Sequence, residues 1–208
     1  MTEPATLRTA EFRRIGDLAV RCGHYCWLEE QLFALTGRWA STPAASISPG
    51  MGAGKTIDPE IRVLCSEMSS WHGFVARQWR DRLPVRAGVD AGALVVPPSG
   101  RVGQAIELLG AQPDVLVALG GLVEPFLPAL LASYEDDDAH ASPVSELPVL
   151  AVLELVRQRA PHEIEAARGV LKRGAEAGTA AEKVADLRAR LQRALGVNRG
   201  IFPAARAS

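Results

Sequence analysis

The chain has 208 residues, with 23 basic and 24 acidic side chains and a formal net charge of −1. This balance of charges argues against a protein that binds nucleic acid by electrostatic attraction. The length is suited to one large domain, which can fold without disulfides or a structural metal. No secretory leader is evident at the N-terminus, and the three cysteines fall within predicted helices, so we expect a cytoplasmic protein.

The first predicted helix covers about residues 7–39, where apolar side chains recur every three or four positions. Glu29 lies within that apolar stripe, four residues after Tyr25. His24 and Trp27 are three residues apart on a flanking face. The pattern therefore predicts a carboxylate on the buried side of this helix.

Residues 40–57 form a predicted loop that ends in PGMGAGKT, which is similar to a phosphate-binding loop. That motif requires glycine where Pro49 stands. No apolar strand precedes it, and Asp58 and Pro59 delay the helix that should begin at the lysine. We therefore expect a surface loop here and no nucleotide site.

The second predicted helix, residues 61–83, carries the most regular apolar stripe in the chain. Asp58 supplies an N-cap side chain and Pro59 suits the first helical position. The stripe consists of Ile61, Leu64, Met68, Trp71, Val75 and Trp79. This spacing predicts that both tryptophans are buried.

A loop at residues 84–101 and a short helix at 102–109 precede a third long helix at 113–134. Pro125 lies inside this helix, together with a second proline, so a kink or break is expected near Gly121. The window from residue 115 to 132 is the most apolar in the chain, and its prolines and glutamate favour buried core over a membrane span.

The acidic run at residues 135–138 is expected to be a solvated connection. A fourth helix then begins at Ser142 or Ser145, and Pro161 is expected to interrupt it. The last segment, residues 178–208, contains an amphipathic helix and a tail. Its spacing suits packing on the bundle or at an interface between copies of the chain.

Long amphipathic helices with few strand signals predict an all-α helical bundle. The stretches HYCWLEEQLF (24–33), SSWHGFVARQWRDRLPV (69–85) and SPVSELPVLAVLELV (142–156) resemble the ferritin-like superfamily, in particular its uncharacterised actinobacterial-type members. The resemblance covers about residues 15–171 and implies a ferritin-like four-helix bundle with additional short helices. We expect the bundle domain to span residues 1–177.

Active ferritin-like proteins bind two irons through one Glu on each of two helices and a Glu-x-x-His pair on each of the other two. The resemblance implies Glu29 and Glu124 as the single glutamates. Both pairs depart from the pattern. Glu67 and His72 are five residues apart, which rotates them by about 140° around a helix, so both cannot point inward. The fourth-helix glutamate is followed three residues later by an arginine, which cannot ligate metal; these are Glu154 and Arg157.

We therefore predict a degenerate, metal-free site in which buried carboxylates are balanced by arginine instead of iron. Its candidate residues are Glu29, Glu67, His72, Glu124, Glu154 and Arg157. Residues that could line a pocket beside it are His24, Tyr25, Trp27, Met68 and Trp71.

The expected function is that of a metal-free ferritin-like bundle, without cofactor, that binds an unidentified protein or small molecule as an accessory to a biosynthetic pathway. The expected partners do not include nucleic acid or membrane. Whether the chain forms a homo-oligomer is left open by the sequence. The alternative is a non-haem diiron oxygenase or hydroxylase that uses iron with an irregular ligand set. Whether the protein is an enzyme is left open by the sequence.

Overall fold

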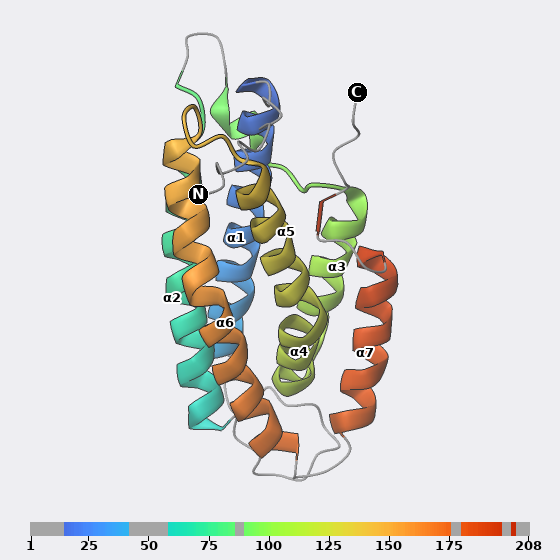
Figure 1. The fold of residues 1–208 in the computed structure, drawn as a ribbon. Coiled ribbons are helices and arrows are strands. Elements are labelled where there is room, and N and C mark those ends of the chain that lie inside the picture. Colours follow the sequence, from blue (N-terminus) through green and yellow to red (C-terminus); the bar gives the residue numbers. More distant parts are fainter. Residues whose placement is uncertain (1–14, 42–57, 86–89, 176–179, 197–200, 203–208) are drawn as a thin grey trace, which may run out of the picture.

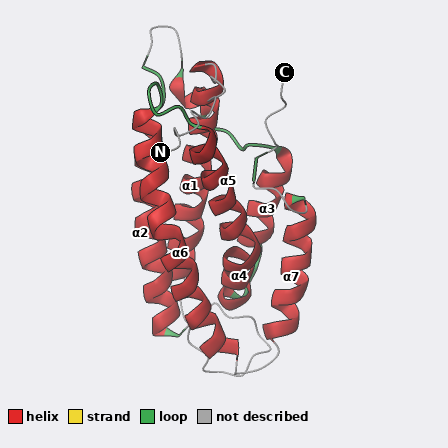
Figure 2. Ribbon diagram, in the orientation of Figure 1, coloured by secondary structure: helices red, strands yellow, loops and turns green. Residues whose placement is uncertain are grey.

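The computed structural model describes residues 15–41, 58–85, 90–175, 180–196 and 201–202. These residues form a helical bundle, and no strand occurs in this part of the chain (Figures 1 and 2). The prediction of an all-α fold is confirmed. The expected start of the first helix at residues 7–14 and the loop with the PGMGAGKT motif lie outside the described residues.

In chain order the elements are α1 (Ile15–Ser41), α2 (Pro59–Arg80), the 3₁₀-helix η2 (Ala91–Leu94), α3 (Gly100–Gly110), α4 (Val115–Gly121), the π-helical turn η3 (Leu122–Phe126), α5 (Leu127–His140), α6 (Leu147–Ala175) and α7 (Ala180–Leu195). Helices α1 and α2 pack along each other, as do α5 and α6, and α2 also contacts α6 (Figure 1). Helix α7 lies against α3 and α4.

Helix α2 begins as its sequence predicts. The Asp58 carboxylate accepts a hydrogen bond from the Glu60 backbone N–H at 2.9 Å, and Pro59 occupies the first turn. Trp79 is fully buried, but Trp71 is only partly buried, so the burial prediction is wrong for Trp71. Trp71 lies at the edge of the bundle, where the Arg159 guanidinium of α6 is 5.6 Å from its ring centroid.

The third predicted helix continues past Pro125 without a break. A π-helical turn follows Gly121, and the Leu127 N–H donates to the Leu122 carbonyl across Pro125, which has no N–H to donate. The helix then continues to His140, so the expectation of a solvated connection at residues 135–138 is wrong. Helix α5 packs against α6, and two carboxylates of this run have partners on other helices: Asp137 accepts a hydrogen bond from Tyr25, and Asp138 pairs with Arg157.

The continuous helical stretch Val115–His140 is long and apolar enough to cross a membrane by length and composition alone. In its most apolar window, 67% of the residues are buried inside the bundle. That burial is the property expected of a core helix, because a lipid-facing helix would present its apolar side chains outward.

Helix α6 starts at Leu147 and runs through Pro161 without interruption. Pro161 is exposed, so its ring lies on the solvent side of the helix and the buried side continues with Ile164, Ala167 and Val170. The predicted interruption is therefore wrong. This continuity decides which acidic residue of α6 faces the core.

Helix α7 approaches α4 closely because two glycines face it. A Cβ atom added at Gly120 would lie 2.8 Å from Val184, and one added at Gly121 would lie 2.6 Å from Leu187. Real Cβ contacts are longer, so only glycine permits this spacing.

The short helix α3, predicted at residues 102–109, is also confirmed, with Ser99 as its N-cap.

Candidate functional site

Four helices each contribute one polar side chain to the interior of the bundle. These are Glu29 from α1, His72 from α2, Tyr134 from α5 and Glu163 from α6. Their relative exposures are 2%, 2%, 2% and 7%, so burying them must be offset by contacts among themselves. We call these four residues the central polar cluster.

The His72 imidazole lies between two carboxylates. Its Nδ1 atom is 2.6 Å from Oε2 of Glu29, and its Nε2 atom is 3.5 Å from Oε1 of Glu163. The Tyr134 hydroxyl donates a hydrogen bond of 2.5 Å to the other oxygen of Glu29. Both oxygens of Glu29 and both nitrogens of His72 therefore face members of the cluster.

The electrostatics of the cluster favour a protonated imidazole. Burial lowers the pKa of His72, but attraction to Glu163 and Glu29 outweighs it, and the net result is a raised pKa. Burial raises the pKa of Glu163, which the neighbouring His72 only partly opposes. Burial and the nearby Glu29 charge raise the pKa of Tyr134 well above 10.0, so this hydroxyl stays a donor.

The cluster does not have the geometry of a metal site. Because the imidazole lies between Glu29 and Glu163, these three potential metal ligands point at one another. They do not point at a shared empty position where a metal ion could bind. In the part of the chain that the structure describes, no group of three or more His, Cys, Asp or Glu side chains is arranged to hold a metal ion. The residues present therefore do not fit a dimetal-carboxylate centre.

A second set of contacts extends the cluster toward the surface. The Tyr25 ring stacks on Tyr134 and Trp79, with centroids 4.5 Å and 4.7 Å apart. Its hydroxyl lies 2.6 Å from Oδ2 of Asp137, which in turn is 3.5 Å from Nε of Arg21. Asp137 is only 2% exposed, although its sequence context suggested a solvated acidic run.

The C-terminal residues Ile201 and Phe202 close the bundle above Tyr25. The Ile201 N–H donates to Oγ of Ser133 at 2.7 Å. The Phe202 ring meets Tyr25 edge-on at 4.8 Å, and the Arg21 guanidinium lies 4.0 Å from its centroid. Both C-terminal residues are buried, so they separate this end of the cluster from solvent.

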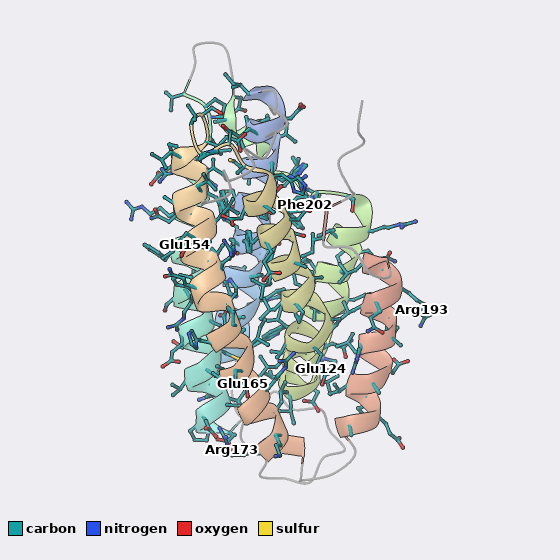
Figure 3. All side chains as sticks on the ribbon, in the orientation of Figure 1. Glu124, Glu154, Glu165, Arg173, Arg193 and Phe202 are labelled. Atoms are coloured by element: carbon teal, nitrogen blue, oxygen red, sulfur yellow. The ribbon has the colours of Figure 1, made fainter. Side chains whose placement is uncertain are left out.

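The structure brings Glu29 and His72 together, as two of the six predicted residues of the polar site. The other four lie away from the cluster, and the predicted approach of Glu29, Glu124 and Glu154 around Arg157 is wrong. Glu124 is exposed and pairs with Arg188 of α7 at 3.0 Å, whereas Glu154 lies on the outer side of α6 (Figure 3).

Helix geometry explains these displacements. Glu67 precedes His72 by five residues and is exposed, as the predicted rotation requires. Glu154 precedes Glu163 by nine residues, which places the two on opposite sides of α6, about 180° apart. Arg157 is half exposed and forms an ion pair with Asp138 of α5. The group that lies between the buried carboxylates and can carry a positive charge there is His72, whereas Arg157 lies outside the cluster.

The residues expected to line a pocket are dispersed. Tyr25 and Met68 are packed in the core, and Trp27 and Trp71 are half-buried. His24 stacks against Phe202, with ring centroids 5.9 Å apart. Burial raises the pKa of the Cys26 and Cys65 thiols to about 12, so neither thiol is a nucleophile near neutral pH.

Three residues of the buried network, Tyr134, Asp137 and Glu163, were not predicted. Glu163 follows Pro161, where the helix was expected to be interrupted. Its position seven residues after Val156 and four before Ala167 would have placed it on the buried face of an unbroken helix.

A groove of about 630 Å³ opens away from the central polar cluster, between the α4–η3 segment, α6 and α7. Its lining residues are Leu116, Gly120, Glu124, Arg168, Leu171, Lys172, Ala181, Val184, Ala185 and Arg188. This size is within the range of small-molecule sites in proteins, about 300–1,000 Å³.

Comparison of the chain with protein-family models, with curated proteins and with solved structures gives no match.

Proposed function

We propose that this protein is a metal-free, ferritin-like helical bundle that acts by binding a small molecule or a protein partner, as an accessory to a biosynthetic pathway. The observation that carries the proposal is the position of the His72 imidazole between Glu29 and Glu163. A protonated imidazole supplies the positive charge that metal ions supply to buried carboxylates in dimetal proteins.

The ferritin-like part of the proposal has support from the origin of the cluster. Its four residues come from α1, α2, α5 and α6, one from each helix, and all four side chains project inward. Dimetal-carboxylate bundles likewise build their centres from inward side chains on four helices. Here the corresponding region contains two carboxylates, one imidazole and one phenol.

The alternative, a diiron oxygenase with an irregular ligand set, fits these residues less well. Nδ1 of His72 and both oxygens of Glu29 are engaged in hydrogen bonds of 2.6 Å or less, and a metal would have to replace them. Glu124, the second implied single glutamate, is bonded to Arg188 outside the cluster. Burial of the whole cluster also gives a substrate no contact with it.

The proposed setting is the cytoplasm, without nucleic-acid or membrane partners. The near-zero net charge supports the first exclusion, and burial of the apolar stretch Val115–His140 supports the second. The groove between α4, α6 and α7 is the place where we propose that a small molecule binds.

Elemental analysis tests the metal-free proposal. The purified chain is incubated with Fe(II) or Mn(II), dialysed and analysed beside a Glu29→Gln variant. We expect only trace metal in both proteins. About two metal ions per chain, lost in the Glu29→Gln variant, would instead favour the diiron alternative.

A further inference from the structure

We propose that the groove between α4, α6 and α7 binds an amphipathic anion, an apolar chain or ring that carries a carboxylate. This inference depends on the proposed function, because it identifies the class of small molecule that the protein binds. The groove has an apolar floor, a cationic rim and one acidic residue in its lining, Glu124.

The floor of the groove is apolar. Leu116, Leu171 and Val184 are partly buried and contribute aliphatic side chains from three different helices. Gly120 is buried beneath them, and because it has no side chain Val184 can pack closely on the α4 backbone at the base of the groove. A hydrocarbon chain lying here would remove apolar surface from water on both sides, which favours binding.

The rim of the groove is cationic. Arg168 and Lys172 are exposed on α6 one turn apart, so both reach the same side of the groove, and Arg188 faces them from α7. Arg168 contacts Glu165 only at 4.0 Å, the longest of the ion pairs in the described residues. A ligand carboxylate between Arg168 and Lys172 would gain two closer partners.

The single acidic residue of the lining does not oppose an anion. Glu124 lies on the side of the bundle that faces α7 (Figure 3) and accepts a hydrogen bond of 3.0 Å from Arg188 of that helix. Arg188 therefore offsets the charge of Glu124. The two cations of α6 remain to attract a ligand, and they select an anionic head group over a neutral one.

Binding of dodecanoate to the full chain, with dodecanol as the neutral ligand of equal chain length, tests the proposal. Both are titrated by calorimetry, dodecanoate below the concentration at which it forms micelles and dodecanol below its solubility limit. We expect dodecanoate to bind more tightly than dodecanol. The Arg168→Gln/Lys172→Gln double variant should weaken dodecanoate binding roughly tenfold and leave dodecanol binding unchanged, because only the anion uses the two cations.

Ala185 offers a steric test, since it is exposed and lines the groove. Ala185→Trp should fill the groove and abolish binding of both ligands. The matched control is Ala189→Trp, one turn along the exposed side of α7 and outside the groove lining, which should bind as the wild type does. Arg77→Gln/Arg193→Gln removes two exposed charges elsewhere and controls for net charge.

Failure of wild-type protein to bind dodecanoate, or binding that persists unchanged in Ala185→Trp, would overturn the inference. If Arg168→Gln/Lys172→Gln and Arg77→Gln/Arg193→Gln lost equal affinity for dodecanoate, the ligand would be attracted by the overall charge of the protein. That result would also contradict a site at the groove. Metal content, measured on the same preparations, distinguishes failure of the groove proposal from failure of the metal-free proposal. A metal-free chain that does not bind dodecanoate would contradict only the groove assignment.

Discussion

The Tyr134 hydroxyl donates a hydrogen bond of 2.5 Å to Oε1 of Glu29, across 105 residues of sequence. This contact joins α5 to α1 inside the bundle and occupies the Glu29 oxygen that His72 does not use. The buried Glu29 carboxylate therefore accepts one hydrogen bond from Tyr134 and one from His72.

Tyr134→Phe should therefore destabilise the fold by about 1.5–3 kcal/mol, the range for hydrogen bonds to charged groups. The ring and its stacking on Tyr25 are retained, so the loss reports the hydroxyl alone. Urea unfolding measures it. Ser70→Ala, which removes an exposed hydroxyl bonded to the Ser66 carbonyl, is the control and should change the free energy of unfolding by less than about 0.5 kcal/mol.

His72→Leu should destabilise the protein by about 3–5 kcal/mol, because it leaves Glu29 and Glu163 buried without a counter-charge. Arg157→Ala, in contrast, should cost less than about 1 kcal/mol, because Arg157 is half exposed and its ion pair is screened by solvent. Chemical unfolding of both variants decides which cation supports the core. A larger loss from Arg157→Ala would contradict the assignment.

Stability of the wild type should fall as the pH is raised. The folded-state pKa values of His72 and Glu163 are both raised, so the folded protein binds more protons than the unfolded chain above their ordinary values, 6.5 and 4.5. The His72 contribution is complete below 6.5 and is lost as the pH rises through its raised folded value. Unfolding free energies from about pH 5.5 to about pH 8.5 should decline, with a shallower decline in His72→Gln.

Two glycine substitutions should act in opposite directions. Gly121→Ala should destabilise the protein by about 1–3 kcal/mol, because its Cβ would overlap Leu187 and Leu191. Gly169→Ala, within α6, should stabilise it by about 0.5–1 kcal/mol, since only the end of the Arg173 side chain lies nearby, at 3.5 Å. Thermal unfolding of the pair tests whether α7 packs on α4 as described.

Phe202→Ala should cost about 3–5 kcal/mol, as expected for a buried aromatic ring. The loss should be accompanied by faster exchange of the protected amides around Ser133 and Tyr25, because Phe202 and Ile201 separate them from solvent. Unchanged hydrogen exchange in this region would show that the C-terminal residues do not close the bundle there.

Much of the fold was predictable because helix signals are local. The cap at Asp58 and the stripe ending at Trp79 both depend on residues within a few turns of one another. Glu29 was identified for the same reason, as a carboxylate within an apolar stripe. Its partner His72 was also singled out.

What the sequence did not reveal depends on contacts between distant helices. The partner of Glu124 is on α7, and no local pattern distinguishes that exposed pair from a buried one. Glu163 was missed because Pro161 precedes it and an interior proline usually interrupts a helix. Here the proline lies on the exposed side of α6, which depends on tertiary packing and cannot be read from the local sequence. Asp137 was concealed by its acidic neighbours, although Tyr25 and Arg21 hold it in the interior.

The central claim is that a protonated His72 imidazole occupies the space between Glu29 and Glu163. Nitrogen-15 NMR of the His72 side chain tests it most directly, with the signals assigned by comparison with His72→Gln. The account predicts that both ring nitrogens still carry protons at a pH just above 6.5, the ordinary pKa of histidine, because Glu163 and Glu29 raise the pKa of His72, and that adding Zn(II) leaves their shifts unchanged. A neutral ring with one unprotonated nitrogen at that pH, or signals that move with stoichiometric metal, would contradict it.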